Sequence, residues 1–72
     1  MDEQKKVREY GVIKAYLPLR GFGFIQRAKG KDVFFLRTDA PTEGVLLEGV
    51  SVSFWVSKEQ QGPRARDITR EG

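Results

Sequence analysis

Residues 50–57 alternate between apolar and other side chains, and this pattern predicts a β-strand with one buried face. One side carries Val50, Val52, Phe54 and Val56, and the other carries Ser51, Ser53, Trp55 and Ser57. The apolar side is expected to line a core. The chain is therefore expected to build at least part of its fold from β-structure.

Four further segments have the pattern of short strands between turns. Residues 7–17 are rich in β-branched and aromatic side chains and stop before Pro18, which lacks a backbone donor. Residues 22–27 and 32–36 flank a polar turn at 28–31 and predict a hairpin. Residues 63–69 follow a turn at 58–62, with Pro63 tolerable at the first position of a strand.

The length of the chain, 72 residues, allows one domain over residues 1–72, with residues 1–8 as a flexible, solvated N-terminal arm. Residues 37–49 contain two glycines and a proline and predict a long connection with one short helical turn. An open sheet this small would leave one face uncovered. We therefore expect an all-β fold, a five-stranded antiparallel barrel that closes on itself.

Several functions are excluded by what the chain lacks. It has no histidine and no cysteine, which removes Ser-His and Cys-His pairs, and the glycine-rich segment does not end as a phosphate loop does. We expect no enzyme, no cofactor, no metal and, in so small a core, no small-molecule substrate. No apolar run is long enough to cross a membrane. We expect a cytoplasmic monomer.

Basic side chains are concentrated in one part of the chain. Residues 14–37 hold six basic residues and one acidic residue, whereas residues 38–57 hold three acidic residues and no base. If the first stretch forms one face, that face attracts polyanions, although solubilising charge on strands and turns gives the same pattern.

Phe22 and Phe24 stand two residues apart and share one face of their strand, with Phe34 beside them in the next strand. Such rings usually fill a core. Here Ile25, together with Val33 and Phe35, already supplies apolar groups for the other face. Because basic residues flank these rings, we interpret them as an exposed platform for stacked bases.

The order and spacing of these motifs resemble the bacterial cold-shock domain over residues 9–69. The matching segments are Gly11-Val12-Ile13-Lys14, Arg20-Gly21-Phe22-Gly23-Phe24-Ile25, Asp32-Val33-Phe34-Phe35, Glu48-Gly49 and Gly62-Pro63-Arg64-Ala65. The resemblance implies a barrel of the oligonucleotide-binding (OB) class that binds single-stranded RNA or DNA across its first three strands.

The resemblance also implies a role for individual residues. The stacking rings are Phe22, Phe24 and Phe34, and Tyr16 stands where the family usually has a phenylalanine. The basic positions that contact the nucleic-acid backbone match Lys14 and Arg20, with Arg64 reaching phosphates from the late loop. An acidic position that hydrogen-bonds a base edge matches Asp32.

Three positions depart from the family pattern. Ala15 replaces an exposed tryptophan, Leu36 replaces a histidine, and Arg37 replaces an aromatic residue. Leu36 offers only apolar contact. Each lost stacking partner costs about 1 to 3 kcal/mol per base, so two losses weaken binding by roughly 30-fold to more than a thousandfold. The guanidinium of Arg37 compensates in part, because it stacks on bases and attracts phosphate.

Two hypotheses follow. The first is a module that binds single-stranded nucleic acid with little sequence preference, as an RNA chaperone or regulator of gene expression. The second is a barrel of the same fold that has lost strong nucleic-acid binding and serves as a protein-interaction or structural module. Trp55 belongs to neither surface, and we expect it to pack against a loop or the N-terminal arm.

Overall fold

The computed structural model describes residues 8–41 and 47–71. Its elements are β1 (Glu9–Leu17), β2 (Phe22–Arg27), β3 (Val33–Leu36), a short 3₁₀ turn η1 (Arg37–Asp39), β4 (Ser51–Glu59) and β5 (Gly62–Arg70). The five predicted strands and the short helical turn are confirmed. β4 and β5 extend further than predicted and leave only Gln60 and Gln61 between them. Most of the expected N-terminal arm, residues 1–7, and residues 42–46 of the long connection lie outside the described residues.

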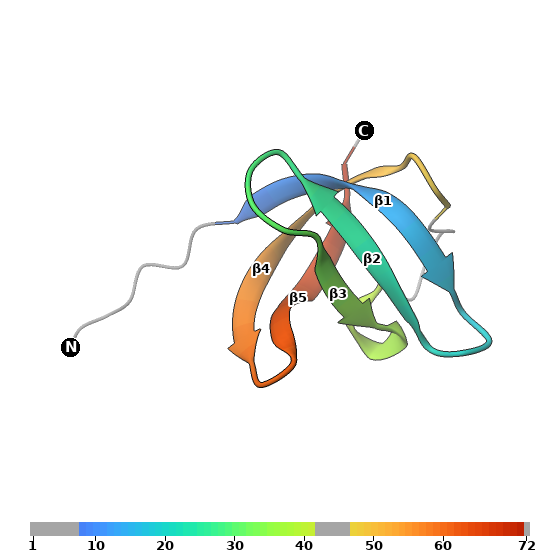
Figure 1. Ribbon diagram of the computed structural model, residues 1–72. Helices are drawn as coiled ribbons and strands as arrows, with labels where there is room; N and C mark the ends of the chain where they lie inside the picture. The colour runs from blue at the N-terminus through green and yellow to red at the C-terminus, as the bar shows by residue number, and fades with distance from the viewer. Residues whose placement is uncertain (1–7, 42–46, 72) are drawn as a thin grey trace.

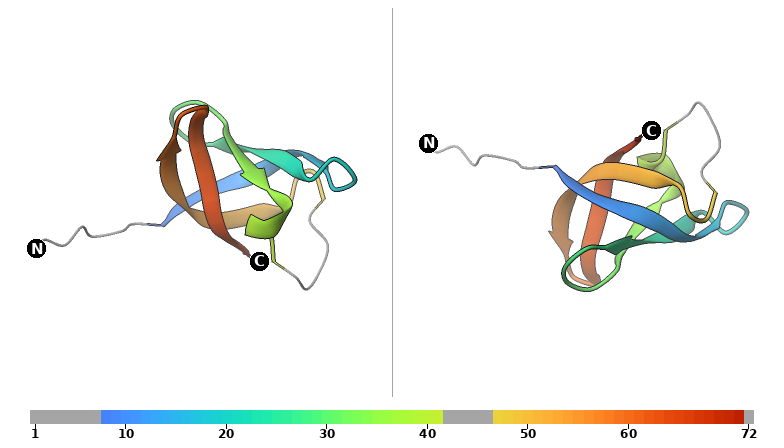
Figure 2. Two further views of the ribbon diagram at one scale, coloured as in Figure 1. Left: turned by 90° about the horizontal axis from the view of Figure 1, so that it is seen from below. Right: turned by 90° about the horizontal axis from the view of Figure 1, so that it is seen from above.

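The strands close into a barrel in the order β1-β2-β3-β5-β4 (Figure 1). All neighbouring pairs are antiparallel except β3 and β5, which run parallel and meet at Phe34 and Arg64. The predicted all-β, five-stranded barrel is confirmed. Its one parallel pair arises because an odd number of strands around a closed ring cannot alternate direction throughout. Seen from below, β5 crosses between β4 and β3 (Figure 2).

The inner side chains of all five strands form one core: Ile13, Ile25, Val33, Phe35, Val52, Phe54, Ala65 and Ile68. Gly23 also faces inward, and a Cβ atom there would lie 2.5 Å from Cζ of Phe35 and 2.6 Å from the carbonyl oxygen of Ala15. The glycine between the two outward phenylalanines thus lets the Phe35 ring pack directly against the β2 backbone.

Ser53 is buried although it lies on the outer side of β4. It is 1% exposed, stands opposite the exposed Tyr10 in the register and alternates with the inward Val52 and Phe54. Its hydroxyl accepts from Nε of Arg8 at 3.1 Å and donates to Oε2 of Glu71 at 2.6 Å. The predicted alternation of β4 is therefore confirmed, and these hydrogen bonds satisfy the hydroxyl of its buried outer serine.

Candidate nucleic-acid interface

Phe22, Phe24 and Phe34 lie on the outer side of β2 and β3, and we call these three residues the aromatic face. Phe24 is directly opposite Phe34 in the strand register. The rings of Phe22 and Phe24 meet edge to face, with centroids 5.8 Å apart. Phe24 is 38% exposed, whereas Ile25 and Val33 are buried. The prediction that these phenylalanines face outward is confirmed.

Apolar side chains extend the aromatic face at one end. Leu17 of β1 and Leu36 of β3 lie on either side of Phe22, each directly opposite it in the register. They are 41% and 37% exposed. Leu36 therefore adjoins the aromatic face as the sequence implied, and it adds contact area without a ring that can stack.

A shallow hollow of about 420 Å³ borders the aromatic face. Its lining residues are Phe22, Phe24, Phe34, Leu36, Glu59, Gln61 and Arg64. Glu59 ends β4 and Gln61 lies in the turn that follows it, and neither was predicted to be part of the site. The parallel contact of β3 with β5 brings this turn to the rings, and no local pattern in the sequence signals that contact.

Tyr16 does not join the aromatic face. It lies opposite the inward Gly23 in the register, and its ring packs against core residue Phe35, with centroids 5.3 Å apart. A bulge in β1 between Ile13 and Ala15 causes this placement, because it shifts the alternation of the residues that follow. The role that the resemblance implied for Tyr16 does not fit this position.

The basic residues near the rings fall into two groups. Nζ of Lys14 lies 2.8 Å from Oδ2 of Asp32, so these two predicted site residues neutralise each other in part. Arg20, in the turn after β1, and Arg37, at the start of η1, are exposed and make no side-chain hydrogen bond or ion pair with any other described residue. The backbone N–H of Arg37 donates to the carbonyl oxygen of Gly21 at 2.8 Å, which holds their two turns together.

Arg64, for which the resemblance implied a contact with phosphates, is bound to Asp39. The Arg64 guanidinium donates two hydrogen bonds to the Asp39 carboxylate, from Nε at 2.8 Å and from Nη2 at 3.0 Å. Arg66 donates a third at 3.1 Å, and the backbone N–H of Leu36 a fourth at 2.9 Å. The Arg64 charge is thus largely compensated inside the protein.

The Asp39 carboxyl is 5% exposed and stays ionised. Burial by itself raises the pKa of Asp39, but the hydrogen bonds from Arg64 and Leu36 and the charges of Arg64 and Arg66 outweigh it and lower the pKa below its ordinary value. The hydrogen bond with Asp39 in turn raises the pKa of Arg64. Asp39 was not among the predicted site residues, although an acidic residue in a predicted helical turn is a common acceptor for free backbone donors.

We expect the free energy of unfolding to fall when Asp39 is protonated. Because the pKa of Asp39 is lower in the folded protein than in the unfolded chain, its ion pairs contribute fully above the unfolded value of about 3.9. The contribution is lost as the pH falls below that value and through the folded pKa. Urea unfolding at pH values from about 7 down to about 3 measures the loss. A carboxyl-carbon NMR titration of Asp39 with its midpoint at or above the unfolded value would contradict this account.

Trp55 lies apart from the aromatic face, in a contact with the first described residue. The guanidinium of Arg8 stacks 5.1 Å from the Trp55 ring centroid and donates to the carbonyl oxygens of Ser53 and Asp67. The expectation that Trp55 packs against a loop or the N-terminal arm is confirmed. The view of Arg8 as simply solvated is wrong, because its hydrogen bonds join the start of β1 to β4 and β5.

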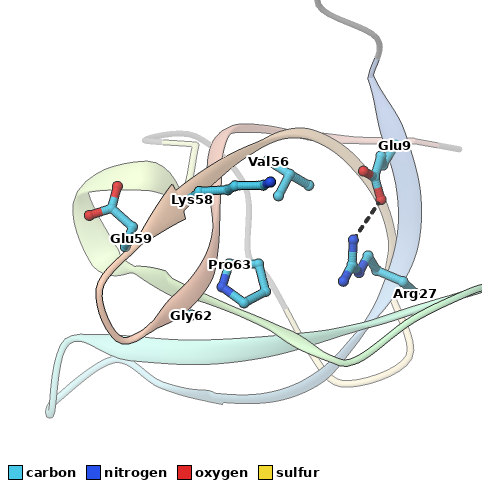
Figure 3. Close-up of a pocket in the computed structure, with 7 residues that line it drawn as sticks. All are labelled: Glu9, Arg27, Val56, Lys58, Glu59, Gly62 and Pro63. Carbon is cyan, nitrogen blue, oxygen red and sulfur yellow. Dashed lines mark hydrogen bonds and ion pairs between the residues drawn. The ribbon is translucent and has the colours of Figure 1, made fainter.

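A second hollow, of about 620 Å³, opens at one end of the barrel. Figure 3 shows Val56 and Pro63 within it and the ion pair between Arg27 and Glu9, whose atoms lie 3.2 Å apart, at its side. Arg27 also donates to the carbonyl oxygen of Lys31 at 2.8 Å. The charged groups of this pair have partners within the protein, and the exposed Lys58 also lines the hollow.

In residues 8–41 and 47–71, no group of three or more His, Cys, Asp or Glu side chains is placed to hold a metal ion. Over the same ranges, no helix has the length and apolar character that a bilayer crossing needs.

Comparison with known proteins gives one consistent result. The family model of the "cold-shock" DNA-binding domain matches residues 9–71. The major cold shock protein of Streptococcus pyogenes serotype M18 is 40% identical over 62 residues, which cover 83% of this chain and 92% of that protein. The cold shock-like protein CspLB of Listeria monocytogenes is 39% identical, covering 83% and 94%. The cold shock protein CspC of Bacillus subtilis is 36% identical, covering 86% and 97%.

Proposed function

The chain belongs to the cold-shock domain family, whose members are nucleic-acid-binding barrels, and from this premise we propose that it holds single-stranded RNA or DNA with little sequence preference. The observation that carries the proposal is the aromatic face itself. Three rings point away from a filled core, and the neighbouring turns carry Arg20 and Arg37, whose guanidinium groups form no ion pair with another described residue. Rings for bases and cations for phosphates are what a single strand requires.

Binding takes place in two parts. Bases stack on Phe24 and Phe34, and Phe22 supplies the edge of the platform, with Leu36 in apolar contact beside it. Phosphates pair with Arg20 and Arg37. A phosphate also replaces Asp32 as the ion-pair partner of Lys14. A displaced Asp32 then accepts a hydrogen bond from a base edge. We assign Arg64 a supporting part, because its guanidinium is already bonded to Asp39.

The cellular role that fits such binding is to keep RNA unstructured or to modulate transcription or translation. Stacking accepts every base, and the affinity of each site stays modest because Ala15 and Leu36 offer no ring. Weak, sequence-tolerant binding by a monomer suits a protein that covers many transient single strands.

A titration followed by NMR tests the proposal. The labelled protein is mixed with short oligothymidine and oligouridine at low salt, and every backbone amide is observed. We expect the shifts to concentrate at residues 14–37, with smaller changes at Gln61, which lines the same hollow. The absence of shifts at high micromolar ligand would overturn the proposal.

The affinity is expected to fall as salt rises. Neutralisation of one phosphate on a single strand contributes a slope of about −0.7 to the logarithm of affinity against the logarithm of salt concentration. If Lys14, Arg20 and Arg37 each neutralise one phosphate, the slope is about −2. Fluorescence anisotropy of a labelled oligothymidine over a salt series measures it. Binding that does not change with salt contradicts the phosphate contacts.

One observation favours a second candidate, a protein-interaction module. Leu17 and Leu36 flank Phe22, and Leu19 is fully exposed at the neighbouring turn. Exposed apolar groups of this kind suit a protein partner. The NMR titration separates the candidates, since this one predicts that neither oligonucleotide shifts any amide of the aromatic face.

A further inference from the structure

Tyr10 is the feature of the outer barrel surface that the proposed binding leaves unused. It is 63% exposed, more than any ring of the aromatic face, and its hydroxyl makes no side-chain hydrogen bond with another described residue. A single exposed apolar residue needs no special explanation. The surroundings of Tyr10, however, are organised in a way that points to a ligand.

The surface next to Tyr10 is hollowed. Tyr10, Val12, Gln26 and Ala28 line an open depression of about 580 Å³ on the outside of β1 and β2. Val12 is 40% exposed and lies directly opposite Gln26. The depression thus combines an aromatic ring and an aliphatic floor with one amide, which can both donate to and accept from a base edge.

This depression continues the aromatic face along β2, the strand that the two surfaces share. Phe24, Gln26 and Ala28 alternate along one side of β2 and the turn that follows it. Four residues of extended chain, roughly 13 Å, separate Phe24 from Ala28. A single-stranded nucleic acid that stacks on Phe24 and runs along β2 therefore reaches Tyr10 without leaving the sheet surface.

The charges along this path suit a polyanion. Lys14 follows Val12 in β1 and precedes Ala15, the register partner of Phe24, and 57% of its side chain is exposed. Lys29 and Lys31 are exposed in the turn that begins at Ala28. The nearby carboxylates are engaged, since Glu9 pairs with Arg27 and Asp32 with Lys14. A phosphate backbone thus meets cations along the path from Phe24 to Tyr10.

We propose that Tyr10 is an additional stacking platform which, with Val12, Gln26 and Ala28, holds a further base of the strand bound on the aromatic face. This subsite rests on the proposed function. It offers a ring at a second place on the sheet, whereas Ala15 and Leu36 provide no ring beside the aromatic face. The consequence is a site whose affinity increases with the length of the oligonucleotide.

The test compares two lengths of oligothymidine, about four and about ten nucleotides, within the range that one OB barrel covers. Tyr10→Ala is expected to weaken binding of the longer strand by roughly 5- to 150-fold at constant salt, and to leave the shorter strand within about twofold. Tyr10→Phe keeps the ring and is expected to match the original protein. Phe24→Ala weakens binding of both strands.

Leu47→Ala is the matched control, because Leu47 is 61% exposed and does not line the depression. Equal binding of the longer strand by the original protein and Tyr10→Ala would overturn the subsite and leave the proposed function intact. Equal weakening of both lengths would also overturn it, by placing Tyr10 in the first site.

Two more outcomes count against the subsite. If the original protein binds neither length, the proposed function fails and the subsite fails with it. Sedimentation identifies the remaining case: a dimer of the original protein that Tyr10→Ala dissociates would make this surface an interface between two copies of the chain.

Discussion

Replacement of Phe24 and Phe34 together by alanine is expected to weaken the binding of oligothymidine by about 2 to 6 kcal/mol, a factor of at least about 30. The two rings lie directly opposite each other on β2 and β3, so the double change removes the centre of the aromatic face. Each lost ring costs about 1 to 3 kcal/mol of stacking. The fold is expected to survive, because the core residues Ile25 and Phe35 are untouched.

Anisotropy of a fluorescent oligothymidine at constant low salt measures this loss, and an amide NMR spectrum of the variant shows whether the barrel is intact. Tyr16→Phe is the control, since this ring packs against core residue Phe35 away from the aromatic face. We expect the control to bind like the original protein. A folded double variant whose affinity stays within about twofold would remove the aromatic face from the binding site.

The outward direction of these rings was predictable from the sequence for a physical reason. Side chains alternate along a strand, and Ile25, Val33 and Phe35 are sufficient to fill the inner side of the β2–β3 hairpin. Phe22, Phe24 and Phe34 were therefore left for the surface. The same reasoning located five of the core residues in β2–β4, since Val52 and Phe54 of β4 are also buried as predicted.

Alternation fails where a strand contains a bulge, and the misplacement of Tyr16 has that cause. A register shift in β1 turns Tyr16 toward the core. A bulge depends on how two strands pair across the barrel, and a single strand carries little trace of it. The outer position of Tyr10 precedes the shift in β1, so it follows the simple alternation.

Contacts between distant segments were the other limit of sequence reasoning. The bidentate pair of Arg64 with Asp39 joins β5 to η1, and Glu59 and Gln61 reach the aromatic face only because β5 lies beside β3. Arg64 alone looks like a free cation in the sequence. Its partner becomes apparent only when the barrel closes.

The pairing of β3 with β5, which closes the barrel, has fewer register partners than any other strand pair. β3 and β5 are joined by a parallel pairing that includes only Phe34 and Arg64 as register partners, whereas the antiparallel pairs run over four or more. Asp39 follows β3 directly and binds both Arg64 and Arg66 of β5. The Asp39 carboxylate therefore joins β3 to β5, as backbone hydrogen bonds join the other strand pairs. It also holds the aromatic face against the turn between β4 and β5.

Asp39→Asn is accordingly expected to lower the free energy of unfolding by about 3 kcal/mol. Breaking a buried ion pair costs about 3 to 5 kcal/mol, and the lower end applies because the side chains of Arg64 and Arg66 are 17% and 48% exposed and reach water. The asparagine retains an oxygen for the Leu36 N–H, so the change isolates the charge. In a domain of this size the midpoint of thermal unfolding falls by roughly 12 to 24 °C.

Urea and thermal unfolding measure the effect, with Asp67→Asn as the control, because that carboxylate also pairs with an arginine but is 73% exposed. The control is expected to lose less than about 1 kcal/mol. If Asp39→Asn does not fold, Arg64→Lys provides the measurement, since it keeps the charge and loses the two-pronged geometry at a smaller cost of about 1 to 2 kcal/mol. An Asp39→Asn protein as stable as the original would show that backbone pairing and the core close the barrel without this carboxylate.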